Sequence, residues 1–181
     1  MTTSTQPLVG TFAIDPIHSL FQFGVKHMGV SAFRASFEDV SGKVVADEQG
    51  IRLDGSVRVE SLTIKQPDFR AHVLNGADFF DAPNHPELTF RSNDIKLRED
   101  GTAEVAGELT IKGITKPFTA TGTYTPVVEA LGGQSRFGVE FEAVVDRRDW
   151  DFSFAAQLPK GGDALANTVK LTANVEFVKE A

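Results

Sequence analysis

The chain has 181 residues, carries a formal net charge of −7 and contains no cysteine. The length suits one domain with a substantial core, and the missing thiols exclude disulfides, a cysteine nucleophile and thiolate-bound zinc. The acidic balance, without a basic cluster, predicts no nucleic-acid partner. No apolar run approaches the roughly 20 residues that span a bilayer, so no integral membrane segment is expected.

The first ten residues are predicted to be a flexible polar tail, and residues 11–181 a single domain. The tail lacks the charged and apolar regions of a secretory signal. We therefore expect a cytoplasmic location for this chain, whereas a chain that had lost such a signal would be periplasmic or secreted.

Apolar and polar residues alternate from residue 19 onward, which is typical of half-buried strands. His27 continues one apolar face, so it is expected to point inward near the end of its strand. In the first half of the chain the apolar positions are Phe21, Phe23, Val25 and His27, then Phe33, Ala35 and Phe37, then Ile51, Leu53, Val57 and Val59, then Leu88 and Phe90.

The second half alternates more regularly, and turn signals separate the strands at residues 47–50, 99–101, 112–117, 132–133 and 161–162. Its apolar positions are Val105, Gly107, Leu109 and Ile111, then Phe118, Ala120, Gly122 and Tyr124, then Phe137, Val139, Phe141 and Ala143, then Val169, Leu171, Ala173, Val175 and Phe177.

One stretch, residues 66–80, interrupts the alternation. Pro67 suits a helix start, and Phe69, Val73 and Leu74 recur at helical spacing. We expect one or two short helices here, lying over one end of the sheet structure.

About eight strands with one apolar face each belong to a sandwich or a closed barrel. An antiparallel barrel of this size can enclose one small ligand. The small inward residues Gly107, Ala120, Gly122 and Ala173 would leave a channel, or would make room for the fifteen phenylalanines; the pattern alone leaves both open.

Three groups of residues carry side chains that are common in catalytic or metal sites. The segment from Asp15 to Ser19 holds Asp, His and Ser but is too local for a hydrolytic triad, and it is interpreted as a turn before a strand. The four histidines show no zinc-binding spacing. The charged run at residues 146–151 is interpreted as a surface turn whose arginines keep its carboxylates ionised, with Trp150 plugging one barrel end.

Several short motifs follow one another along the chain. They are residues 14–19 (IDPIHS), 23–28 (FGVKHM), 69–74 (FRAHVL), 78–82 (DFFDA), 86–92 (PELTFRS), 107–117 (GELTIKGITKP) and 146–150 (DRRDW). Together they resemble the YceI-like family of polyisoprenoid-binding, lipocalin-like proteins, over residues 11–178. Two positions depart from the family pattern: Phe12 stands where Trp is frequent, and Ala71 where an acidic residue commonly follows the arginine.

The resemblance implies an all-β, lipocalin-like antiparallel barrel with an elongated apolar tunnel for a long isoprenoid chain, such as a polyprenyl lipid or quinone precursor. It also implies possible homodimers. A polar head would sit at the mouth, where Lys26, His27, Arg70 or His72 would offer donors.

The resulting prediction is non-catalytic binding, transport or storage of such a lipid, with no cofactor, no metal and no catalytic residue. The alternatives are an enzyme that modifies a lipid or isoprenoid through a His-based metal or acid/base site, and a stress-response partner protein with a filled barrel. The predicted ligand-binding residues are Phe21, Phe23, Val25, His27, Phe37, Val57, Val59, Arg70, His72, Phe90, Leu109, Ile111, Phe118, Phe141, Leu171 and Val175.

Overall fold

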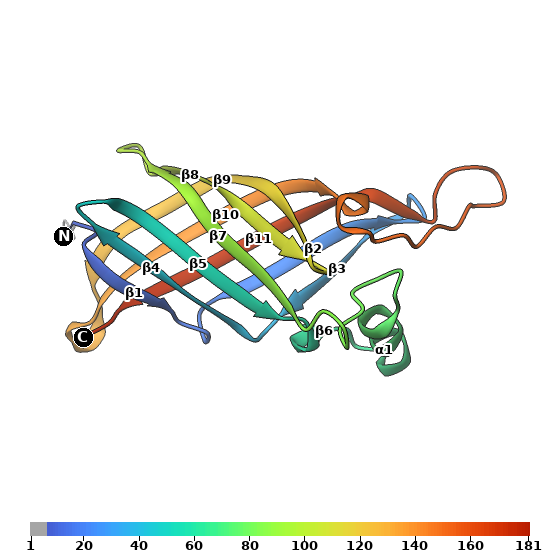
Figure 1. Cartoon of the computed structure of the whole chain (residues 1–181), viewed down its shortest axis with the longest axis horizontal. Coiled ribbons are helices and arrows are strands. Elements are labelled where there is room, and N and C mark those ends of the chain that lie inside the picture. Colours follow the sequence, from blue (N-terminus) through green and yellow to red (C-terminus); the bar gives the residue numbers. More distant parts are fainter. Residues whose placement is uncertain (1–6) are drawn as a thin grey trace.

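The computed structural model describes residues 7–181, in which all strands belong to one antiparallel sheet rolled into an elongated barrel (Figure 1). Residues 1–6 of the expected tail lie outside the described part. The strands are β1 (Gly10–Ile14), β2 (Leu20–His27), β3 (Ser31–Phe37), β4 (Val40–Asp47), β5 (Gly50–Arg58), β6 (Leu62–Thr63), β7 (Glu87–Leu97), β8 (Thr102–Ile111), β9 (Ile114–Glu129), β10 (Ser135–Asp146) and β11 (Leu165–Lys179). The helices are α1 (Pro67–Asn75) and the short 3-10 segments η1 (Val59–Ser61), η2 (Leu131–Gly133) and η3 (Arg147–Trp150).

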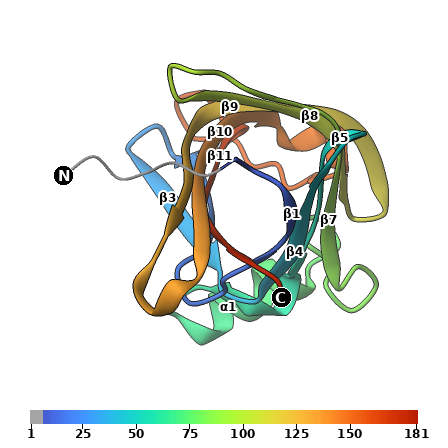
Figure 2. The same cartoon turned by 90° about the vertical axis from the view of Figure 1, so that its left-hand side faces the viewer.

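Eight strands close the ring, in the order β1, β4, β5, β7, β8, β9, β10 and β11, and β11 pairs back onto β1. At the junction Ile14 faces Phe177, and Phe12 faces Val44 on the other side. Figure 2 looks along the barrel from the end that carries both termini. The predicted closed antiparallel barrel of about eight strands is confirmed, because eight antiparallel strands pair in a continuous ring.

The opposite end of the barrel is built differently. Strand β2 continues from β1 after a break at residues 15–19 and pairs with the first part of β11, where Phe23 faces Leu171. Strand β3 pairs with β2, but its other edge meets only the two-residue β6. The ring therefore closes by hydrogen bonds at the end with the termini, called here the closed end, and is completed by loops and α1 at the other, called the open end (Figure 1).

Helix α1 occupies part of the stretch in which a helix was predicted. The Gln66 side chain caps it by accepting the N–H of Phe69, and Pro67 stands in the first turn, where its missing N–H costs nothing. Val73 and Leu74 are buried. Residues 76–82 then form tight turns rather than a second helix. No helix among residues 7–181 has the length and apolarity needed to cross a bilayer.

Most of the buried apolar side chains form two clusters. The closed-end cluster contains Phe12, Val44, Ala103, Val105, Ala120, Val127, Phe137, Val139, Phe141, Val175 and Phe177. The open-end cluster contains Ala35, Phe37, Val40, Val57, Val59, Leu62, Val73, Leu74 and Phe80.

The turn predicted at residues 112–117 is shorter than expected. Lys112 and Gly113, with φ of 50° and 72°, form a two-residue hairpin turn, and β9 starts at Ile114. Pro117 lies inside the strand and faces Glu108. Proline is tolerated there because β10 pairs with β9 only from Thr121 onward, so that part of β9 is a sheet edge.

The small interior residues serve two purposes. A Cβ on Gly122 would stand 1.7 Å from the carbonyl oxygen of Glu140, and one on Gly107 would stand 2.8 Å from the Phe90 ring. These glycines therefore allow close approach of a neighbouring strand or ring. Ala120 and Ala173, in contrast, line the cavity described next.

Candidate functional site

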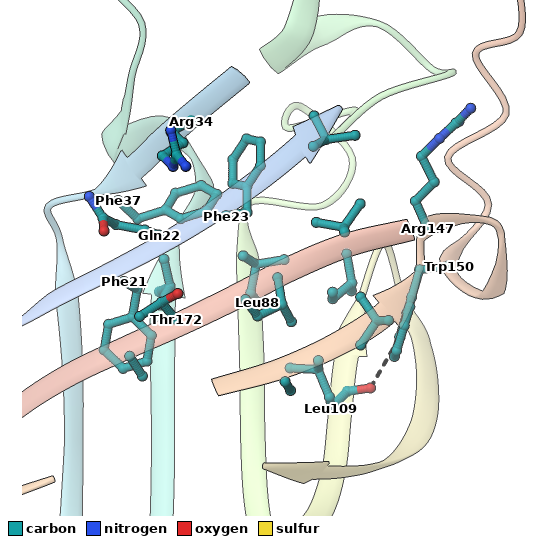
Figure 3. A pocket seen from close by; sticks show the side chains of 18 of the residues that line it. Phe21, Gln22, Phe23, Arg34, Phe37, Leu88, Leu109, Arg147, Trp150 and Thr172 are labelled. Atoms are coloured by element: carbon teal, nitrogen blue, oxygen red, sulfur yellow. Dashed lines mark hydrogen bonds between the residues drawn. The ribbon is translucent and has the colours of Figure 1, made fainter. Parts of the chain in front are cut away.

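The barrel encloses a cavity of about 870 Å³ that extends from the closed-end cluster to the open end. This volume falls within the range of small-molecule sites, roughly 300–1,000 Å³. Its wall is almost entirely hydrocarbon, and Figure 3 shows Phe21, Phe23, Leu88 and Leu109 in part of it. The alternation along each strand places these side chains inside. The sequence pattern allowed either a channel or a filled interior, and the structure contains the channel.

Aromatic rings from separate segments surround the open end of the cavity. Phe79 stacks on Phe154 with centroids 5.0 Å apart, and Phe80 meets Phe152 edge-on at 5.0 Å. Phe69 on α1 lines the cavity and is 43% exposed. This end therefore offers an apolar rim that is partly open to solvent.

Two buried, positively charged side chains, Arg147 and Lys112, hold the loops of this rim in place. The Arg147 guanidinium donates to the carbonyls of Phe152, Phe154 and Ala166 at 2.5, 2.7 and 3.0 Å. Its burial lowers the pKa of Arg147 from the ordinary value. These donors are committed to backbone carbonyls, so their role in the structure is to position the loop that follows η3.

Lys112 also holds the rim in place, from the β8–β9 turn. Its Nζ donates to the carbonyls of Ala77 and Asp151, both at 2.7 Å, and lies 5.2 Å from the Phe152 ring centroid. The β8–β9 turn is thereby joined to the segment after α1 and to η3.

Trp150 packs against the cavity wall beside β8. The indole is buried and its N–H donates to the Leu109 carbonyl at 3.3 Å (Figure 3). Arg148, two residues before Trp150, pairs with Asp146. Hydrogen bonds from Arg148 lower the pKa of Asp146 to about 2. The prediction of local ion pairs is confirmed here, but the buried Arg147 was wrongly assigned to a surface turn.

The structure brings most of the predicted ligand-binding residues to one cavity. Whether they bind a ligand stays a prediction. The fourteen that line the cavity are Phe21, Phe23, Val25, His27, Phe37, Val57, His72, Phe90, Leu109, Ile111, Phe118, Phe141, Leu171 and Val175.

The other two predicted residues, Val59 and Arg70, lie outside the cavity wall. Strand β5 ends at Arg58, and the Val59 N–H donates to the Pro86 carbonyl at 2.9 Å, so the alternation stops before Val59. Val59 is instead fully buried in the open-end cluster. Arg70 donates from Nε to the Leu62 carbonyl at 2.8 Å and from a terminal nitrogen to that of Glu60, which fixes α1 to η1 and β6.

Of the donors proposed for a polar head, His27 and His72 line the mouth of the cavity, whereas Lys26 does not.

Sequence reasoning missed the rim aromatics that lie outside regular strands, because those segments show no period. Phe152 and Phe154, two residues apart after Trp150, carried the only signal that could have found them. The cavity-lining residues that were not predicted include Phe33, Phe69, Phe79, Phe80, Phe152, Phe154, Arg147 and Trp150.

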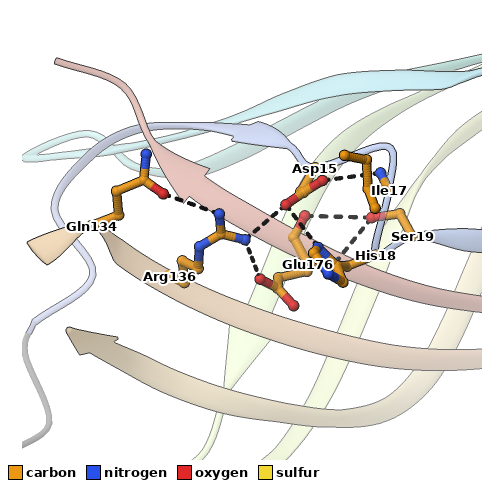
Figure 4. A network of polar contacts seen from close by, with 7 residues as sticks. All are labelled: Asp15, Ile17, His18, Ser19, Gln134, Arg136 and Glu176. Carbon is orange, nitrogen blue, oxygen red and sulfur yellow. Dashed lines mark hydrogen bonds and ion pairs between the residues drawn. The ribbon is translucent and has the colours of Figure 1, made fainter. Parts of the chain in front are cut away.

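A second polar site lies at the break between β1 and β2 (Figure 4). Asp15 accepts from His18 Nδ1 at 3.0 Å and from Arg136 at 2.7 Å, and Arg136 also pairs with Glu176. The bonds from His18 and Arg136 hold the pKa of the Asp15 carboxyl well below its usual range. Ser19 Oγ is engaged by the Glu176 N–H at 3.1 Å. This network joins β1, β2, β10 and β11 and contains no nucleophile–base pair.

Asp15, His18 and Glu176 are also the group of possible metal ligands found among residues 7–181. The Arg136 guanidinium already bridges the two carboxylates. A cation between them would have to compete with this fixed charge, so the geometry favours an ion-pair network over a metal site.

Comparison with known proteins bears on this arrangement. The YceI-like domain profile matches residues 12–177. The chain belongs to the YceI-like family. Among its relatives, the UPF0312 protein of Pseudomonas putida strain F1 is 27% identical over 180 residues, covering 97% of this chain and 90% of its own. That of Staphylococcus aureus strain RF122 is 28% identical over 170 residues, covering 92% and 96%.

Solved structures show that this YceI-like protein shares its fold with other barrels. BcnA of Burkholderia cenocepacia matches with a TM-score of 0.70 at 23% identity, over 90% of this chain and 98% of its own. The YCEI protein of Campylobacter jejuni gives 0.72 at 22% identity, over 86% and 90%. A polyisoprenoid binding domain from Saccharophagus degradans, implicated in plant cell wall breakdown, gives 0.69 at 10% identity, over 93% and 98%.

Proposed function

We propose that this YceI-like protein binds a long-chain isoprenoid lipid non-covalently in its barrel and carries or stores it without covalent chemistry. The observation that carries the proposal is the cavity of about 870 Å³ with a hydrocarbon wall. The polyisoprenoid binding domain that shares the fold supports this choice of ligand class.

The energetics favour such a ligand. Each CH₂ removed from water contributes about 0.8 kcal/mol, so a chain of several isoprene units gains far more than a compact polar molecule would. The lining offers few groups to satisfy polar atoms, and an unpaired polar group buried there would cost free energy. A polar head would remain at the mouth, near His27 and His72.

The lining includes few groups that could act as an acid or base, namely His27 and His72 at the mouth and Glu142. The Arg147 guanidinium donates its hydrogen bonds to three backbone carbonyls. The Asp15 network belongs to the strand junction rather than to the cavity wall. Catalysis needs an acid, base or nucleophile within reach of the reacting atom. A binding role therefore fits the arrangement better than an isoprenoid-modifying enzyme.

Native mass spectrometry of protein mixed with a prenyl alcohol tests the proposal. We expect a one-to-one complex that survives buffer exchange. Protein that stays free of every prenyl alcohol offered would contradict it, and conversion of the alcohol to a new product would favour the enzyme.

Two adjacent residues on β10 provide matched variants for this experiment. Ala143 lines the cavity, whereas Val144 points outward and is 68% exposed. Ala143→Asp would place a carboxylate in the hydrocarbon wall and should weaken binding at least about tenfold. Val144→Asp adds the same charge outside and should bind like the unaltered protein. Equal binding by the two variants would place the ligand outside the barrel.

A further inference from the structure

Three phenylalanines stand across the closed end of the barrel. Phe137 stacks on Phe177 with centroids 4.7 Å apart, and Phe12 meets Phe137 edge-on at 5.0 Å. Phe12 is 0% and Phe177 1% exposed, the two largest fully buried side chains of the described residues. We call these three rings the closed-end stop.

The closed-end stop marks where the cavity ends. Phe177 lines the cavity, whereas Phe12 and Phe137 lie behind it and do not. Val44, Ala103 and Val127 fill the remaining space in the same cluster, also without lining the cavity. The cavity is therefore blind at this end.

The backbone around the closed-end stop is fixed on both sides. Phe177 faces Phe137 on β10 and Ile14 on β1, in continuous antiparallel ladders. The Asp15 N–H donates to the Glu176 carbonyl at 2.8 Å, next to the Arg136 ion pairs. Close-packed interiors yield little to pressure from a ligand, so the stop cannot move aside without breaking these bonds.

The open end, in contrast, has a partly exposed lining. Phe69 on α1 and Met28 at the β2–β3 turn both line the cavity and are 43% and 47% exposed. A lipid chain would therefore enter at this end, with its tail leading toward Phe177.

The size of the cavity then defines a chain length. If each carbon with its hydrogens occupies about 30 Å³, as one molecule of liquid water does, the cavity of about 870 Å³ holds about 30 carbon atoms, or roughly six isoprene units. The lining of β11 runs from Leu165 to Phe177, with a register shift between Leu165 and Val169, and twelve residue steps give about 40 Å along the strand. The cavity is therefore elongated, and its length along β11 suits a chain of this kind.

We propose that the closed-end stop limits the ligand chain that this barrel can bury to about 30 carbon atoms, with Phe177 as the residue that meets the end of the chain. This inference rests on the proposed function and adds a chain-length preference to it. It predicts that affinity rises with each isoprene unit until the tail reaches Phe177, and then rises no further, because additional units stay in water.

Two substitutions should move this limit in opposite directions. Phe177→Ala removes six ring carbons, slightly more than the five carbons of one isoprene unit, and should raise the limit by one unit. Val175→Phe, one inward position closer to the mouth, fills the cavity above the stop and should lower the limit by about one unit. Because Val175 borders open cavity, the larger ring has space to occupy.

The experiment measures the dissociation constants of a graded series of prenyl alcohols by competition in native mass spectrometry. Leu62→Ala serves as the control, because Leu62 is fully buried in the open-end cluster but does not line the cavity. Its limit should match that of the unaltered protein. If Phe177→Ala does not fold, the shift of Val175→Phe still tests the proposal.

A break near six units that moves with both variants supports the closed-end stop. If the affinity of the unaltered protein keeps rising beyond about six units, or if both variants show the same chain-length limit as the unaltered protein, the closed-end stop does not limit chain length. Lipid binding itself would still stand. Failure of the unaltered protein to bind any member of the series would instead overturn the proposed function itself.

Discussion

The two ends of this barrel use the same residue type for different purposes. At the closed end, phenylalanine rings pack on one another behind Phe177 inside a ring of hydrogen-bonded strands. At the open end, rings such as Phe69 and Phe154 belong to a helix and a loop, and they border a cavity. Where the strands close on one another the aromatic cluster is core alone, and where loops complete the ring the aromatic side chains also form a rim.

The largest expected effect is the loss of a closed-end ring. Phe12→Ala should lower the free energy of unfolding by about 3–5 kcal/mol, because the completely buried ring leaves a cavity that the closed ladder cannot fill. Phe69→Ala, at the half-open rim, should cost less than about 1 kcal/mol. Urea unfolding of both variants measures the difference. Similar losses would mean that the two ends are equally well packed.

The next effect concerns the loop after η3. Arg147→Lys keeps the charge but cannot reproduce the three-carbonyl fork, and should destabilise this loop by about 1–3 kcal/mol. Hydrogen exchange should accelerate at the amides of Phe152 and Phe154, while that of Val175 in β11 stays slow. Uniform acceleration at all three would show that Arg147 supports the whole barrel rather than its rim.

A smaller effect belongs to the network beside the closed end. Since the folded pKa of Asp15 lies below its usual 3.8, its contribution is present above about pH 4 and is lost as pH falls below that value. Asp15→Asn should cost about 1–2 kcal/mol at neutral pH. It should also flatten the decline of stability below about pH 4. Thermal unfolding measured across this range tests the sign, and an unchanged pH profile would remove Asp15 from the acid response.

The sequence predicted the barrel well because strand alternation has a period of two, and this period survives wherever a strand is flanked on both sides. The prediction that Val59 lines the cavity was wrong, because β5 ends one residue earlier and the chain turns there. The hairpin at Lys112 was also misjudged, since a proline inside an edge segment looks the same as one in a turn.

The rim was harder to predict than the wall. Arg147 and Arg148 are neighbours in one charged run, yet one is buried against carbonyls and the other pairs with Asp146 in solvent. Sequence spacing cannot separate them, because the difference depends on carbonyls of the loop that folds back over η3. Phe79 and Phe154 likewise meet only through the tertiary fold.

The smallest effect is expected at Trp150, which joins the rim to the wall. Trp150→Phe removes the bond to the Leu109 carbonyl and should cost about 0.5–1.5 kcal/mol. In the unaltered protein this single tryptophan is buried against the cavity, so its emission should change when a prenyl alcohol binds. Ala143→Asp, with the same tryptophan, should lose that response. A signal that persists in Ala143→Asp would mean that the ligand contacts the rim alone, and the contrast between the two ends would then not extend to binding.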